Sequence, residues 1–164
     1  MAATTSAAIR DVLIAAVKAL TPATLGHVPF KAHDQRSIVG TEFQVWCDKN
    51  PTGAFRRFSI TDDGNEQPVG ASNTDVDRVT LEMEVTIAYP RDHRYGAQQK
   101  LDAFDVMKSD LNQLSYAVGY RAFATLDAAN ATVLEPERTR RVEGDACFFT
   151  VITVPFEFWR ARPA

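Results

Sequence analysis

The stretch VTLEMEVTIAY, residues 79–89, decides the fold of this 164-residue chain. Apolar side chains occupy every second position in it, at Val79, Leu81, Met83, Val85, Ile87 and Tyr89. Successive side chains of a β-strand point to opposite faces, so strict alternation predicts a half-buried antiparallel strand. We expect this strand to run from Val76 to Tyr89 and to end at Pro90.

A second long strand is predicted near the C-terminus, where FFTVITVPFEFW occupies residues 148–159. We expect it to run from Ala146 to Trp159. It is largely apolar on both faces, with Phe149 and Val151 on the face opposite Phe148. Such a strand is buried on both sides, either within the subunit or on assembly. A bulge at Pro155 that splits the strand is the alternative.

The length of these two strands carries information about shape. Fourteen extended residues reach roughly 46 Å at ~3.3 Å each. A domain of this size has a radius of gyration near ~15 Å. Two such strands therefore either curl strongly or project as an arm, and a projecting apolar strand needs a partner that covers it.

The remaining elements are predicted from periodicity and turn residues. Two helices, from Ser6 as N-cap to Leu20 and from Gly96 to Val118, repeat apolar residues every three or four positions. Three shorter strands are expected at 41–47, 55–61 and 131–138, with a turn near 143–145. The element order is α-β-β-β-α-β-β. We expect a single α+β domain over 1–164, with a mainly antiparallel four- to five-stranded sheet and two helices packed on one face.

Residues 62–75, DDGNEQPVGASNTD, are polar and have no apolar period. Glycine, proline and asparagine in this stretch favour a loop, which we expect to be mobile and to act as a docking element. Asp62, Asp63 and Glu66 are its candidate interface residues. Phe149 and Val151 are candidates for a subunit interface on the last strand.

Composition sets broad limits on function. The net charge is −3, from 18 basic and 21 acidic residues, which gives no general attraction to duplex DNA. We expect no membrane association, because the chain has neither a secretory signal nor an apolar run of ~20 residues. Cys47 and Cys147 lie in apolar stretches far apart in sequence, which favours buried free thiols over a disulfide.

Catalytic and ligand-binding motifs are absent from the sequence. It has no nucleophile elbow, no phosphate-binding glycine loop and no metal-ligand spacing, so we expect no catalytic residue, metal or cofactor. His27 and His33 lie in one predicted loop, and a small enzyme built around that loop is an alternative. Glu82 and Glu84 share the polar face of the first long strand, where carboxylates usually serve solubility.

The order and pattern of these elements resemble the tail terminator proteins of long-tailed bacteriophages and the related neck and tail-completion proteins. The residues that carry the resemblance are IRDVLIAAVKAL (9–20), VTLEMEVTIAYPR (79–91), QQKLDAFDVMKSDLNQL (98–114) and FFTVITVPFEFW (148–159).

The resemblance implies a structural protein of the virion tail or neck, made in the host cytoplasm. Proteins of this family form a six-fold ring that caps the tail tube and joins it to the head-side connector, with DNA passing through as cargo. If this chain forms such a ring, Glu82 and Glu84 are candidates for its channel wall, because acidic groups do not bind phosphates. A monomeric ligand- or protein-binding module, with its ligand between the sheet and the second helix, is a further alternative.

Overall fold

The computed structural model describes residues 3–20, 33–34, 40–50, 57–62, 66–71, 76–90, 107–114, 131–133 and 138–162. Residues 107–114 form a helix. The labelled elements are α1 (Ser6–Lys18), β1 (His33–Asp34), α2 (Gly40–Lys49), β2 (Arg57–Thr61), β3 (Gln67–Ala71), β4 (Val76–Pro90), β5 (Ala131–Val133), β6 (Arg138–Glu143) and β7 (Cys147–Ala161).

The described strands form one sheet in the order β1-β2-β4-β7-β5, with β3 also paired to β4 and β6 also paired to β7. Only β1 and β2 pair in parallel; the other described pairs are antiparallel. Both helices and a mainly antiparallel sheet are present, so the predicted α+β class is confirmed. The sheet has more strands than predicted because several are only two to six residues long.

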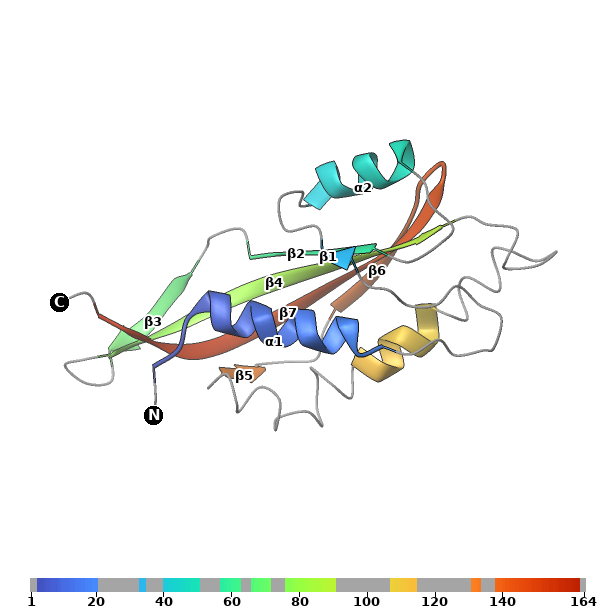
Figure 1. Ribbon diagram of the computed structural model, residues 1–164. Helices are drawn as coiled ribbons and strands as arrows, with labels where there is room; N and C mark the ends of the chain where they lie inside the picture. Colours follow the sequence, from blue (N-terminus) through green and yellow to red (C-terminus); the bar gives the residue numbers. More distant parts are fainter. Residues whose placement is uncertain are drawn as a thin grey trace.

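β4 and β7 are the two predicted long strands, and each has 15 residues. They pair without interruption from Val76 opposite Ala161 to Pro90 opposite Cys147. Pro155 lies inside this ladder, opposite Glu82, so no bulge splits the strand. Figure 1 shows the two strands as a twisted ribbon along the length of the described molecule, with the chain termini at one end and the β6–β7 hairpin at the other.

One face of the sheet, which we call the first face, carries the main core. α1 and helix 107–114 cover it, as predicted for the two helices. Its buried side chains include the alternating residues of both long strands and the inner face of α1: Val79, Leu81, Met83, Val85, Ile87, Tyr89, Phe148, Ile152, Val154, Phe156, Phe158, Ile9, Leu13 and Val17. The predicted residues 96–106 and 115–118 of the second helix lie outside the described residues.

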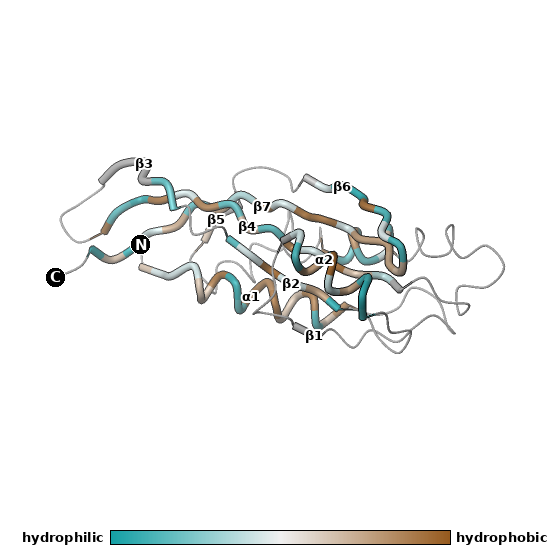
Figure 2. Tube along the Cα trace, turned by 90° about the horizontal axis from the view of Figure 1, so that it is seen from above, coloured by the Kyte–Doolittle hydropathy of each residue, from teal (hydrophilic) through white to brown (hydrophobic). Residues whose placement is uncertain are grey.

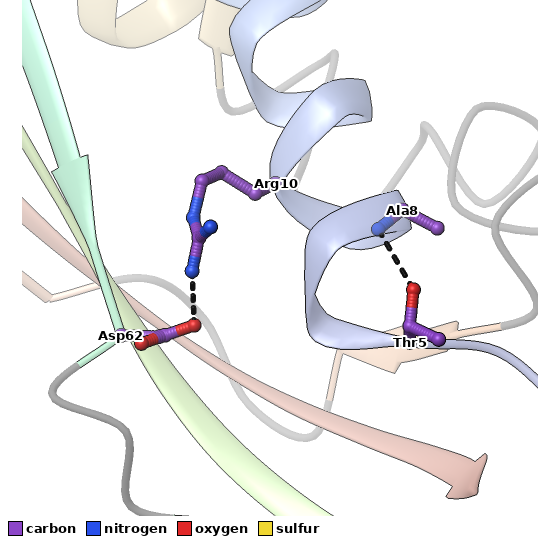
Figure 3. A network of polar contacts seen from close by, with 4 residues as sticks. All are labelled: Thr5, Ala8, Arg10 and Asp62. Atoms are coloured by element: carbon purple, nitrogen blue, oxygen red, sulfur yellow. Dashed lines mark hydrogen bonds and ion pairs between the residues drawn. The ribbon is translucent and has the colours of Figure 1, made fainter. Parts of the chain in front are cut away.

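The start of α1 differs by one residue from the prediction. Thr5, rather than Ser6, is the N-cap, and its hydroxyl oxygen accepts a hydrogen bond from the backbone N–H of Ala8 at 3.2 Å (Figure 3). Either hydroxyl suits a cap. The cap falls at Thr5 because the chain immediately before it is tied to β7, through Thr4 N–H donating to Trp159 O at 2.7 Å.

The predicted strand at 41–47 is wrong, because these residues belong to helix α2. Phe43 and Cys47, four residues apart, are fully buried on one helical side, whereas Val45 between them is 46% exposed. A strand over 41–47 would place all three on one face, because side chains two positions apart in a strand point to the same side. A short segment with apolar residues at 43, 45, 46 and 47 fits both the two-residue period of a strand and the 3.6-residue period of a helix. Packing against the sheet selects the helix.

α2 covers the opposite side of the sheet, which we call the second face, at the end near the β6–β7 hairpin (Figure 1). A second buried cluster lies beneath it, formed by Phe43, Cys47, Ala88, Cys147 and Phe149, with Trp46 and Val142 packed at its edge. Helices therefore lie on both faces of the sheet, and the helix on the second face was not predicted.

The predicted mobile loop at 62–75 is wrong for residues 67–71, which form β3. β3 pairs with β4 from Gln67 opposite Thr80 to Ala71 opposite Asp77, with an irregularity between Pro68 and Gly70. Proline and glycine are compatible with such an edge strand, where pairing on one side suffices. Residues 63–65 and 72–75 lie outside the described part of the chain.

Candidate functional site

The second face changes character along the long strands. Near the hairpin it is apolar and covered by α2. Toward the chain termini most of its side chains are half-buried or exposed, although Pro155 is buried among them. We call this part the open face, and its half-buried or exposed residues are mostly polar: Thr61, Arg78, Thr80, Glu82, Glu84, Thr153, Glu157 and Trp159. In Figure 2 the residues of β7, taken regardless of face, change from mainly hydrophobic near the hairpin to more hydrophilic near the C-terminus.

Glu82 and Glu84 lie at the centre of the open face. Their cross-strand neighbours are Pro155 and Thr153 of β7, and Thr61 of β2 lies beside Glu84. Glu82 is exposed and Glu84 is half-buried. The predicted position of both carboxylates on the polar side of the strand is confirmed. That they line a channel stays a prediction.

Phe149 and Val151 were predicted to form a subunit interface, and the structure contradicts this role. Both side chains are only 1% exposed within the single chain. Phe149 packs against Phe43 and Cys47 of α2, the helix that the sequence had suggested was a strand. A side chain already covered by its own subunit has no apolar surface left to bury against another one.

Asp62 and Glu66 were predicted as candidate interface residues of a docking loop, and both pair with arginines of the same chain. Arg10 of α1 binds Asp62 (Figure 3), and Arg160 of β7 binds Glu66. The two carboxylate side chains are 16% and 20% exposed. Asp63 lies outside the described residues. Asp62 and Glu66 therefore lie against α1 and β7 and are not in a fully solvated loop.

Two further ion pairs lie near the same end of the molecule. Arg162 binds Asp77 at 2.7 Å, and Arg78 lies 4.0 Å from Glu157. All these groups are at least partly exposed, so each pair contributes little to stability. Together they neutralise the charge around the paired ends of β4 and β7.

Arg57 holds the C-terminal end of α2, a role that the sequence did not reveal. Its guanidinium donates to the carbonyl oxygens of Asn50 at 2.7 Å and Cys47 at 3.2 Å. The guanidinium carbon lies 4.9 Å from the centre of the Trp46 ring. The last carbonyls of a helix lack helical partners and carry partial negative charge, so a buried cation satisfies them. Arg57 is only 4% exposed, although arginines are mostly exposed in proteins.

Asp48 fixes the same helix to the β6–β7 turn. Its carboxylate accepts hydrogen bonds from the backbone N–H groups of Asp145 at 3.2 Å, Ala146 at 3.1 Å and Cys147 at 3.1 Å. Gly144 is needed beside it, because a Cβ there would lie 2.7 Å from the carboxylate carbon of Asp48. Successive N–H groups of a turn form a concave anion site, which this chain fills with its own side chain.

The two cysteines meet beneath α2. Both are free and buried, as predicted, and the Cys147 thiol donates to the Cys47 carbonyl oxygen at 3.8 Å. Burial raises the pKa of the Cys47 thiol to about 12, and the nearby Arg57 guanidinium opposes this shift only in part. Because the thiolate is the reactive form, Cys47 is a poor nucleophile at neutral pH.

The outer side of α2 carries an open hollow of about 340 Å³ lined by Thr41, Glu42, Val45, Trp46 and Lys49. Of the large apolar side chains in the described part of the chain, Val45 is the exposed one. Glu42 and Lys49 are exposed at the two ends of this surface.

The histidines proposed for an enzyme are not brought into a described site. His27 lies outside the described residues, and the backbone of His33 pairs with Arg57 in the sheet. The described ranges contain no group of three or more His, Cys, Asp or Glu residues placed to hold a metal ion. No described helix is long and apolar enough to span a membrane.

Comparison with known proteins adds little. No family model matches the chain, and no curated protein matches it. Among solved structures, one with 16% identity aligns over 96% of this chain and 93% of its own, with a TM-score of 0.40. Similarity at that level carries no argument about function, which rests on the residues themselves.

Proposed function

We propose that this chain is a structural virion protein that assembles into a ring at the end of a phage tail tube. The ring joins the tube to the head-side connector, and DNA passes through it. This is the role implied by the resemblance of the element order to tail terminator and neck proteins. The observation that carries the proposal is the uninterrupted 15-residue pairing of β4 with β7.

The long ladder supports an assembly role because none of the described helices covers its open face. Among the described helices, α1 and helix 107–114 cover the first face, and α2 covers the second face near the β6–β7 hairpin. The open face remains as an extended polar surface with Glu82 and Glu84 at its centre. Arg78 on this face lies 4.0 Å from Glu157, so its charge is offset locally. Such a wall suits a channel through which DNA slides, since unpaired basic groups would bind its phosphates.

Subunit contacts must differ from those suggested by the sequence, since Phe149 and Val151 are buried. The outer strands β3 and β6 each pair with a single described strand and lie on opposite sides of the β4–β7 ladder. Edge strands of this kind can pair with another chain. If β3 of one copy pairs with β6 of the next, the contact is heterologous. Such contacts close into a ring when the rotation from each copy to the next adds up to a full turn.

The test combines native mass with microscopy. The purified chain is examined by light scattering and negative-stain electron microscopy, alone and with a candidate tail tube protein. Rings with a central opening, seated on tube ends, are expected. A chain that stays monomeric at high concentration and leaves tube length and ends unchanged would refute the proposal and favour a monomeric binding module.

A further inference from the structure

The outer surface of α2 has an ordered pattern of charge and apolarity. Glu42 is exposed in the first turn and Lys49 in the last, with Val45 and Trp46 between them. Lys49 is seven positions after Glu42, about two helical turns, which places them on one helical side about 10.5 Å apart along the axis. Val45 is 46% exposed, so the middle of this surface is apolar and open to solvent.

This pattern is complementary to itself. The midpoint between Glu42 and Lys49 falls between Val45 and Trp46. A second copy of α2 laid antiparallel across that midpoint places its Lys49 opposite Glu42 and its Glu42 opposite Lys49. The two apolar centres then cover each other, and the antiparallel helix dipoles also attract. No other orientation of two α2 helices forms both ion pairs at once.

We propose that the outer surface of α2 is a two-fold contact between two copies of this chain. The helix is well suited to this because its inner side is already occupied: Phe43 and Cys47 pack on the sheet, Arg57 holds its end and Asp48 binds the β6–β7 turn. Only the side that carries Glu42, Val45 and Lys49 faces outward. The contact is isologous, so it is separate from the heterologous contact that a ring requires.

The size of the surface sets its strength. α2 has ten residues and is about 15 Å long. One side of so short a helix offers much less area than the roughly 800 Å² per partner that a stable dimer buries. A weak dimer is therefore expected, populated only at high protein concentration and disrupted by salt, because exposed ion pairs are screened.

Sedimentation of the full chain over a range of concentrations, at low and high salt, measures this association. Glu42→Lys and Lys49→Glu each turn both attractive pairs of the dimer into repulsive ones. Each should weaken dimerisation about five- to thirtyfold, as expected for two exposed pairs. Val45→Asp, which puts two carboxylates beside the two-fold axis, should abolish it. Lys18→Glu is the matched control, since Lys18 is also exposed in the last turn of a helix.

Mixing the two single variants gives the decisive result. In a heterodimer of Glu42→Lys with Lys49→Glu, both ion pairs become attractive again, with two lysines on one partner and two glutamates on the other. The mixture should dimerise about as well as the wild-type chain, although neither variant does so alone. The doubly changed chain, Glu42→Lys with Lys49→Glu, should also regain dimerisation.

Three results would overturn the proposal: a wild-type chain with no dimer at any concentration or salt, a dimer unaffected by these substitutions, or a mixture no more associated than its components. Ring formation that survives Val45→Asp would leave the proposed function intact, so the two proposals fail independently. Circular dichroism of each variant establishes that α2 is retained.

Discussion

Replacing Asp48 by Ala should loosen α2 from the β6–β7 hairpin. The carboxylate accepts three backbone hydrogen bonds from the turn, at 3.1–3.2 Å. α2 in turn covers the buried cluster around Phe149. Truncation removes all three acceptor contacts at once and leaves the turn N–H groups to water.

The expected loss follows from the exposure of these bonds. A hydrogen bond to a charged group contributes about 1.5–3 kcal/mol, but one of the three is exposed and two are only part-buried, so water compensates in part. We expect Asp48→Ala to lower the free energy of unfolding by about 2–3 kcal/mol. For a chain of this length that lowers Tm by about 4–12 °C. Asp48→Asn should lose part of this stability, because its side-chain NH₂ group cannot accept a hydrogen bond from the N–H groups of the turn.

Gly144 provides a specific test of the geometry. Its φ is not in the left-handed region, so alanine meets no backbone strain there. The cost of Gly144→Ala arises from displacing the Asp48 carboxylate, which we expect to cost about 1–3 kcal/mol. In the Asp48→Ala background that obstacle is gone, and Gly144→Ala should be neutral or stabilise the protein by about 0.4–1 kcal/mol.

Urea unfolding, followed by the fluorescence of Trp46 and Trp159, measures all members of this cycle. Glu42→Ala is the control on the same helix; at dilute protein it should change stability by less than about 0.5 kcal/mol. Equal costs of Gly144→Ala in both backgrounds would refute the contact. So would an Asp48→Ala variant as stable as the control.

The remaining predictions concern the core, the thiol and the open face. Arg57→Ala should cost about 2–4 kcal/mol in urea unfolding, because two carbonyls at the end of α2 lose a buried charged donor; a loss under 1 kcal/mol would contradict that role. Leu81→Ala should cost about 2–5 kcal/mol, since the residue is 2% exposed in the main core. Cys47 is protonated more tightly when folded, so stability should fall as pH rises from about 9 through about 12, and Cys47→Ala should flatten that fall; an unchanged slope would count against it. Glu82→Lys combined with Glu84→Lys should leave folding and ring formation intact but slow genome ejection, and normal ejection would exclude the channel role.

The sequence alone predicted the long strands and the main core. The alternation of apolar and polar residues at 79–89 and the run of apolar residues at 148–159 each extend over a long segment. Both strands appear with nearly the expected ends. The helical period of residues 9–20 likewise placed Ile9, Leu13 and Val17 in the core. Long periodic segments are predictable because many side chains must satisfy the same face.

The sequence did not predict α2, β3 or the contacts around them. Residues 41–47 fit a helix and a strand equally, and their burial against Ala88 and Phe149 decides for the helix. β3 contains proline and glycine, and it forms because β4 extends far enough to pair with it. Arg57, Asp48 and Gly144 are ordinary residues in the sequence. Their roles depend on partners brought together from up to 99 positions away, which only the tertiary structure does.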